Sequence, residues 1–383
     1  MNEKQNLRLK RNVGLDYVHT FLSNMNMQSS IWVLYLAYCG MHLAQIGLLE
    51  GIYHATSIVC EIPSGAAADL LGRKRCMILN PGSEEALVYD SMKCLGQEEH
   101  YMGVYGRLNV LIEVAQGLAT VAGGALAEFS YFWCYAACVV IAVLALLPVL
   151  WMAEPTQCGE AADTAGEGVE DAAEGTPAQR TIRETVKHHF AVSACILQKD
   201  VRIGKIIGFY SVVFAAHTLL FFYSQQYFAD LGYNKVQISV IMLLVGGASC
   251  LGALVSEKMY RWFGKKCLIP ETVIIAGAIL CYGAGKAGVA IAALMCAGFA
   301  NAALYPIQSD SLNALIPSEQ RATLISVDSM CFSIVMIVLF PLAGALADRW
   351  GLKTVLLLLG VILLLFLLTV FCIEKESFSS DHS

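Results

Sequence analysis

The chain has 383 residues, of which 57% are hydrophobic and only 15% are charged, with a formal net charge of -6. Soluble domains carry about a quarter charged residues, so the composition excludes an ordinary soluble enzyme and a basic nucleic-acid-binding domain. The mean hydropathy of +0.60 reflects repeated apolar stretches of about 18 residues or more, enough to cross a bilayer. Because lipid cannot satisfy open backbone groups, we predict an all-α polytopic membrane protein.

The first half of the chain contains four apolar stretches of membrane-spanning length, at 17–39, 43–66, 105–127 and 130–152. The segment after them is acidic and rich in small residues, so it can bury little apolar surface. We therefore expect an N-terminal transmembrane bundle over 1–152 and a cytoplasmic linker over 153–203 that ends in a short interfacial helix.

The second half contains six further apolar stretches, at 204–227, 237–256, 267–285, 288–309, 322–346 and 353–373. They predict a C-terminal bundle of six helices over 204–374 and a cytoplasmic tail over 375–383.

The basic residues indicate the orientation of these helices. With the N-terminus inside, all but four of the 25 Lys and Arg residues fall in cytoplasmic segments; the four are Lys235, Lys286, Arg349 and Lys353. This asymmetry is what the positive-inside rule requires. We therefore expect an integral protein of the plasma (inner) membrane with both termini in the cytoplasm.

The two halves share a weak internal repeat. At an offset of 220 residues Asp90 matches Asp310, Ser91 matches Ser311, and residues 124–127 match 344–347. Repeated halves are typical of secondary transporters, whose substrate site lies between the halves near the middle of the membrane. The repeat predicts two pseudo-symmetric helical bundles.

Residues 65–74 at the end of the second apolar stretch read Gly-Ala-Ala-Ala-Asp-Leu-Leu-Gly-Arg-Lys. This segment resembles the loop signature Gly-x-x-x-Asp-x-x-Gly-Arg-Lys of the major facilitator superfamily (MFS). The resemblance implies the MFS fold and a gating motif that holds the cytoplasmic side closed, formed by Gly65, Asp69, Gly72, Arg73 and Lys74. An alternative is that the basic residues serve only as topology anchors. A degenerate copy lies at 252–266, and another at 344–351 on the expected outer side.

The MFS fold has twelve helices, six in each half, and the first half of this chain has room for only four. The outgoing third helix stops near residue 79 and a turn follows at 80–82, so most of one helical hairpin is missing. We expect an incomplete N-terminal half and about ten full spans plus a short stub. Either an internal deletion or a natural ten-helix variant explains the gap.

Ionisable residues at membrane depth are costly and are therefore functional candidates. Glu50 and His54 lie one helical turn apart on one face, which suggests a pair that handles protons. Glu113 and Asp328 are further candidates for proton coupling. For each residue the alternative is a polar side chain that pairs with a neighbour and sets the packing.

Other polar residues are candidates for the substrate cavity or for interactions between helices. The cavity candidates are Asn24, Asn26, Gln28, Tyr35, His217 and Gln225. Asp90 and Asp310 occupy matching positions at cytoplasmic helix ends, where we expect them to lock the bundles.

The chain has no phosphate-binding loop, no cluster with metal-ligand spacing and no catalytic arrangement of side chains. We therefore expect no catalytic residues, no metal site, no cofactor and no nucleic-acid partner. The resemblance implies a monomeric secondary transporter that moves a small solute by alternating access, coupled to a proton or another cation.

The direction of transport rests on a second resemblance. Residues 117–124 resemble the glycine-rich fifth-helix signature of MFS antiporters, without its usual proline. The resemblance favours the export of small organic compounds, and the missing proline weakens that assignment. The alternatives are a symporter that takes up a nutrient, and a membrane protein that does not transport because the hairpin is missing.

Overall fold

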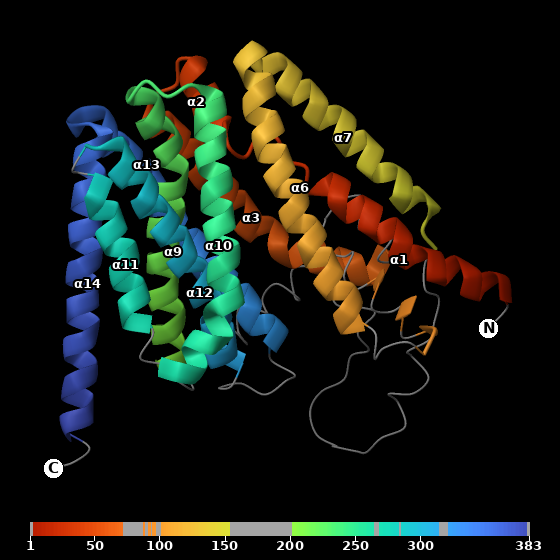
Figure 1. The fold of residues 1–383 in the computed structure, drawn as a ribbon. Helices are drawn as coiled ribbons and strands as arrows, with labels where there is room; N and C mark the ends of the chain where they lie inside the picture. The colour runs from red at the N-terminus through yellow and green to blue at the C-terminus, as the bar shows by residue number, and fades with distance from the viewer. Residues whose placement is uncertain are drawn as a thin grey trace. The chain divides into compact units, whose positions relative to one another are not determined.

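The computed structural model describes residues 3–71, 87–88, 91–92, 94–96, 101–153, 201–263, 268–282, 285–313 and 321–380. The regular structure in these ranges is helical, as predicted (Figure 1). The region of the expected missing hairpin near residues 79–82 lies outside the described residues, and so does the linker from 154 to 200. The chain divides into two compact units, Met1–Gln28 with Val59–Phe190 and Ser29–Ile58 with Ala191–Ser383.

The first unit contains α1 (Glu3–Ser23), α6 (Tyr101–Phe129), α7 (Tyr131–Trp151) and the C-terminal part of α3 (Leu43–Leu71). Helix α1 packs against α6 and α7. Only Ser130 separates α6 from α7, and it caps α7: its hydroxyl accepts a hydrogen bond from the Phe132 N–H at 3.2 Å.

The face of α1 that is buried in the first unit is polar. Asn12, Asp16, His19 and Thr20 recur every three or four residues, and each is nearly inaccessible. The Asn12 amide donates to the Ser91 hydroxyl at 2.9 Å and to the Ala153 carbonyl at 2.8 Å, and its oxygen accepts from the Ala153 N–H at 2.9 Å. These bonds satisfy a polar side chain that would otherwise be costly to bury.

The predicted first span over 17–39 is not one continuous helix. Helix α1 ends at Ser23, and α2 (Trp32–Tyr38) begins only after a non-helical segment. The Asn24 amide donates to the Thr20 carbonyl at 2.9 Å, a bond that competes with the regular helix ladder. Several polar residues follow Asn24, so the apolar pattern is too weak to continue the helix.

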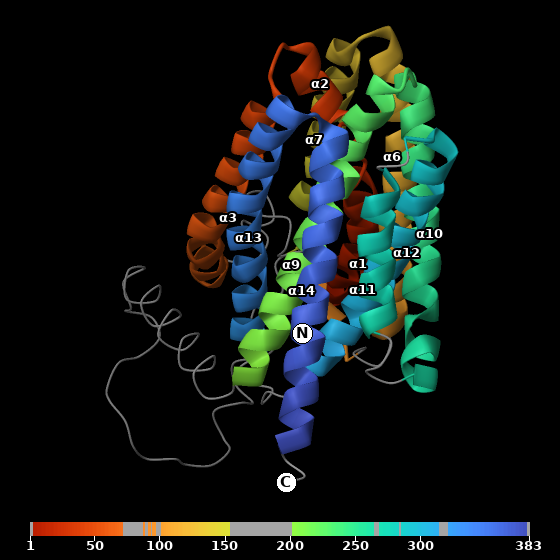
Figure 2. The same cartoon turned by 90° about the vertical axis from the view of Figure 1, so that its left-hand side faces the viewer.

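The second unit contains α2, the N-terminal part of α3 and six longer helices (Figure 2). These are α9 (Val201–Asp230), α10 (Lys235–Phe263), α11 (Leu268–Cys281), α12 (Ala287–Asn313), α13 (Arg321–Trp350) and α14 (Leu352–Ser380). Helix α9 lies at the centre, because it contacts α2 and each of α10 to α14. Helices α10 and α12 approach closely at Gly252, where a side chain would collide with the backbone of Phe299.

Aromatic rings fill the middle of the second unit. Tyr223, Phe228, Tyr282 and Phe340 are fully buried, and the rings of Tyr227 and Tyr282 lie 4.6 Å apart between centroids. Two of the tyrosine hydroxyls have backbone partners: Tyr223 donates to the Phe340 carbonyl at 3.3 Å, and Tyr227 to the Tyr282 carbonyl at 3.0 Å. Such ring pairs stabilise by about 0.5–1.5 kcal/mol beyond their buried area.

Seven helices within the described ranges are long and apolar enough to cross a membrane. They are Val110–Phe129, Tyr131–Trp151, Ile203–Asp230, Lys235–Trp262, Ala287–Gln308, Val327–Trp350 and Leu352–Thr369. Helix α11 is apolar but shorter. Many large apolar side chains on these helices are exposed, as expected where lipid covers them. The prediction of an all-α polytopic membrane protein is confirmed.

Candidate functional site

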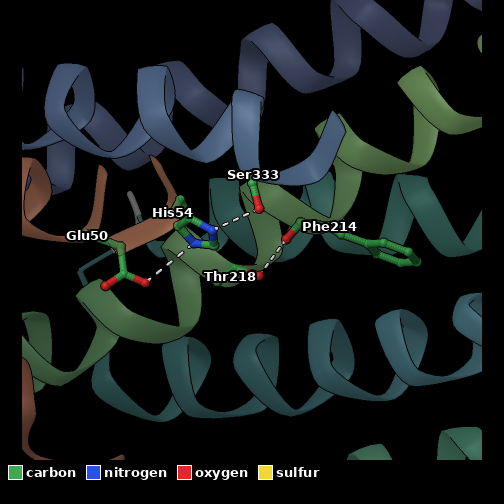
Figure 3. Close-up of polar contacts among 5 residues, drawn as sticks. All are labelled: Glu50, His54, Phe214, Thr218 and Ser333. Atoms are coloured by element: carbon green, nitrogen blue, oxygen red, sulfur yellow. Dashed lines mark hydrogen bonds and ion pairs between the residues drawn. The ribbon is translucent and has the colours of Figure 1, made fainter. Parts of the chain in front are cut away.

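The clearest polar site of the second unit lies between α3 and α13 (Figure 3). His54 is buried, and its Nε2 atom lies 3.6 Å from the Oε1 atom of Glu50, one turn earlier on α3. Its Nδ1 atom lies 3.2 Å from the hydroxyl oxygen of Ser333 on α13. The imidazole therefore connects a carboxylate to a hydroxyl group on a different helix.

This geometry allows two protonation states of the His54 imidazole. In the neutral ring Nε2–H faces the Glu50 carboxylate, which can only accept, so Nδ1 accepts a hydrogen bond from the Ser333 hydroxyl. In the imidazolium both nitrogens donate, and the Ser333 hydroxyl turns to become an acceptor. The site can therefore take up a proton without losing either contact.

Two aromatic rings contact the imidazole. The rings of Tyr53 and Phe332 lie edge-on to His54, with centroid distances of 5.4 Å and 5.6 Å. Thr218 on α9 appears in the same view, but its hydroxyl donates to the Phe214 carbonyl within its own helix at 2.8 Å (Figure 3). The polar contacts of His54 thus come from α3 and α13.

The predicted proton-coupling residues Asp328 and Glu113 have different surroundings. The Asp328 carboxylate is half-buried on α13 and accepts a hydrogen bond from the Gln308 amide of α12 at 2.8 Å. Glu113 belongs to the first unit and its side chain is exposed on α6. Asp328 therefore has a hydrogen-bond partner on a neighbouring helix, as His54 does.

In the second unit, most of the buried polar atoms without a hydrogen-bond partner within the described residues lie on α9, and others lie on α11 and α12. They include Nε2 of His217, Oε1 of Gln225 and Oδ1 of Asn301. Gln225 is completely buried, and its amide nitrogen donates to the Ser29 carbonyl at 3.1 Å. A buried polar atom without a partner costs about 1–3 kcal/mol, so such atoms point to water or a bound solute.

The other predicted cavity residues belong partly to the first unit. Asn24 and Gln28 are half-buried there and Asn26 is exposed, whereas Tyr35 is half-buried on α2 of the second unit. The Asn24 oxygen accepts a hydrogen bond of 3.5 Å from the Gln116 amide. The structure therefore brings Tyr35, His217 and Gln225 into one compact unit and the remaining candidates into the other.

The predicted gating motif is described only in part. Gly65 and Asp69 lie on the helical backbone of α3, whereas Gly72, Arg73 and Lys74 lie outside the described residues. Asp90 also lies outside them, and Asp310 is described only as part of the backbone of α12. Their roles stay predictions.

Two polar residues of the second unit were not predicted as site residues from the sequence. Ser333 had no signal, because a serine in an apolar helix is common and its partner lies 279 positions away. Glu271, in the first turn of α11, is 1% exposed, and neither carboxylate oxygen has a hydrogen-bond partner within the described ranges. Its position at the start of the predicted span 267–285 was a signal that could have been used.

Comparisons with known proteins give one matching family model and several solved structures with a similar fold. The model of the Major Facilitator Superfamily matches residues 95–327 and 272–381. A mutant of the nucleoside transporter NupG has a TM-score of 0.72 at 13% identity, over 96% of this chain and 100% of that chain. A bacterial homologue of the human lysosomal transporter Spinster, solved inward-facing and unoccupied, has a TM-score of 0.58 at 15% identity, over 95% and 96%.

A D-xylose-proton symporter has a TM-score of 0.53 at 15% identity, over 96% of this chain and 97% of that chain. No curated protein sequence matches the chain. The structural similarity confirms the fold predicted from residues 65–74 and from the internal repeat, and the match to the family model covers most of the chain. The chain belongs to the Major Facilitator Superfamily.

Proposed function

We propose that the chain is a secondary transporter that moves a small solute by alternating access and couples this movement to protons through Glu50 and His54. The observation that carries the proposal is the buried His54 imidazole between the Glu50 carboxylate and the Ser333 hydroxyl. Ionisable groups at membrane depth mark proton and substrate pathways, and histidine is the side chain whose ordinary pKa lies nearest to neutral pH.

The charge of the pair supports this role. With a neutral imidazole the Glu50–His54 pair carries one negative charge, and with one more proton it carries none. Moving a charge through a low-dielectric environment is costly, so the protonated pair can be buried and moved more readily. Proton binding also reverses the hydrogen bond between His54 and Ser333, which joins two helices.

The substrate class follows from the buried polar atoms of the second unit. Amide and imidazole atoms of Gln225, His217 and Asn301 have no partner within the described residues, so they are available to a polar solute. The similar structures include a nucleoside transporter, a D-xylose-proton symporter and proton dependent oligopeptide transporters. We propose a small polar organic compound as the substrate, bound near α9 and α12.

Two directions of transport are open to such a protein. The antiporter-like stretch at 117–124 favours export. Uptake with protons is the second candidate, because one of the similar structures is a D-xylose-proton symporter. The orientation in the membrane follows from the basic residues. Their asymmetry supports a plasma-membrane protein with cytoplasmic termini and a cytoplasmic linker over 153–203. In this orientation residues 65–74 would act as the cytoplasmic gating motif.

The full-length protein in proteoliposomes tests this proposal. Under an imposed pH gradient, a panel of nucleosides, pentoses, short peptides and cationic drugs is screened for accumulation. His54→Gln should abolish accumulation driven by the gradient and leave exchange of unlabelled for labelled solute intact. The matched control is His42→Gln, the same replacement at an exposed histidine of the second unit.

Two results would refute the proposal in different ways. Accumulation by His54→Gln equal to that of His42→Gln would remove His54 from coupling. Absence of both accumulation and exchange for the whole panel, from protein that is folded and correctly inserted, would favour the non-transporting alternative.

A further inference from the structure

The N-terminal end of α3 is capped by a side chain from another helix of the second unit. Near the end of α13, the Asp348 Oδ1 atom accepts a hydrogen bond from the Leu43 N–H at 3.0 Å, and Oδ2 accepts from the Ala44 N–H at 2.9 Å. The first N–H groups of a helix have no partner within the helix, and they carry the positive end of its dipole. A carboxylate that accepts from two of them is well placed in both charge and geometry.

Helix α3 has no equivalent cap from its own chain segment. The residue before Leu43 is His42, which is not among the side chains that cap helices well. The Gln45 side chain accepts from the His42 N–H at 2.9 Å, so it leaves the amides of Leu43 and Ala44 to Asp348. Without Asp348 these two amides would turn to water.

Below the cap the two helices approach closely because glycines replace side chains. A Cβ atom on Gly344 would collide with the Leu43 carbonyl, and one on Gly47 would collide with the Phe340 carbonyl. One turn further, a Cβ atom on Gly51 would lie 3.3 Å from the Ile337 carbonyl oxygen. The contacts thus continue in antiparallel register along both helices.

This register connects the cap to the proton site. We call the contact between residues 43–54 of α3 and residues 333–348 of α13 the α3–α13 seam. The seam begins at the Asp348 cap, passes the glycine contacts and ends at the hydrogen bond between His54 and Ser333. At about 1.5 Å per residue it is roughly 16 Å long. Figure 2 shows α3 and α13 side by side in this region.

The residue spacing of the cap repeats that of the predicted gating motif. Residues 344–351 read Gly-Ala-Leu-Ala-Asp-Arg-Trp-Gly, and residues 65–72 have the same two glycines and aspartate at the same spacing. In the 344–351 segment the structure shows a role for both glycines and for the aspartate. Gly344 permits close approach, Asp348 caps α3, and Gly351 has a φ of +82°, which favours glycine.

We infer that Asp348 is the gate residue on the side of the membrane where α3 begins: its carboxylate holds the α3–α13 seam closed, and this gate opens when the cap breaks. The inference rests on the proposed alternating access and on cytoplasmic termini, which place the beginning of α3 on the outer side. Asp348 is then the outer counterpart of the gating motif at 65–74, and its seam leads directly to the pair that binds the proton.

The test measures the distance between α3 and α13 in the full-length protein in nanodiscs. Spin labels are attached to p-acetylphenylalanine at Leu48 and Trp350, which are exposed residues of the two helices, so the native cysteines stay in place. Asp348→Asn and Asp348→Ser are compared with the parent. The control is Asp230→Asn, because the Asp230 carboxylate is exposed at the end of α9 and accepts from Gln226 of its own helix at 2.7 Å.

Both Asp348 variants should increase the ratio of long to short distances about fivefold, which is the effect of losing a typical helix cap. Asp230→Asn should match the parent. One folded Asp348 variant is sufficient for the test. If its distance distribution is the same as that of the parent, the inference is overturned. If the distance shifts but no solute flux is detected, the gate is supported and the proposed transport function is refuted. If flux is coupled to protons but the distances do not change, only the inference about the gate is refuted.

Discussion

Replacing Gly47 by alanine is the sharpest probe of the α3–α13 seam. The added Cβ atom would lie 2.8 Å from the carbonyl carbon of Phe340 and 3.0 Å from the Cα atom of Pro341. Carbon atoms in contact normally lie about 3.5–4.0 Å apart, so the helices must separate by about 0.5–1 Å. The atoms in the way are backbone, so no side-chain rotation can relieve the collision.

The magnitude follows from two opposing effects. Overpacking of a tight interface costs about 1–3 kcal/mol. Alanine stabilises a helix relative to glycine by about 1 kcal/mol. Gly246→Ala on α10 is the matched control, because a Cβ atom there meets nothing within 4 Å and only the helix preference changes. The two variants should therefore differ in the free energy of unfolding by about 1–3 kcal/mol, with Gly47→Ala less stable.

Thermal unfolding of both variants in the same detergent, followed by intrinsic fluorescence, measures this difference. At about 2 °C per kcal/mol, Gly47→Ala should melt about 2–6 °C below Gly246→Ala. Separation of the helices should also weaken the 3.2 Å hydrogen bond between His54 and Ser333. If Gly47→Ala melts at or above the temperature of Gly246→Ala, the close contact of α3 with α13 is refuted.

Three further predictions concern other parts of the molecule. Asn12→Ala removes three hydrogen bonds, two of them with Ala153, and should lower the stability by about 3 kcal/mol; an unchanged melting temperature would contradict these contacts. Gly351→Ala places a side chain at a φ of +82° and should cost about 1 kcal/mol, measured by the same melting experiment; equal stability would show that this turn is not strained. Gln225→Leu removes the unpartnered amide oxygen and the hydrogen bond to the Ser29 carbonyl, and should raise the KM of the transported solute about tenfold or more; an unchanged KM would place the solute elsewhere.

Apolar length predicted most of the helices well. The stretch at 130–152 corresponds to α7, Tyr131–Trp151, and the stretch at 353–373 lies within α14, Leu352–Ser380. The stretch at 17–39 failed as a single span because length and composition do not show where polar side chains interrupt a helix. The asparagine at position 24 bonds to the backbone of its own turn, and this local competition decides where α1 ends.

The candidate site was predictable only within one helix. The spacing of Glu50 and His54 requires that they share a face of α3, and their side-chain atoms indeed lie 3.6 Å apart. Ser333 and Asp348 contribute through tertiary packing with residues about 280 and 305 positions away. A repeat of the 65–72 pattern was visible at 344–351, but only the fold shows that its aspartate caps α3.

Solute-induced current on solid-supported membranes tests proton coupling most directly. Proteoliposomes that contain the parent protein, His42→Gln or His54→Gln are exposed to a neutral substrate without a pH gradient, so that only coupled protons carry charge. The account predicts equal currents from the parent and His42→Gln and none from His54→Gln, even though His54→Gln still exchanges the solute. A current from His54→Gln equal to that of the parent would contradict the role of the Glu50–His54 pair.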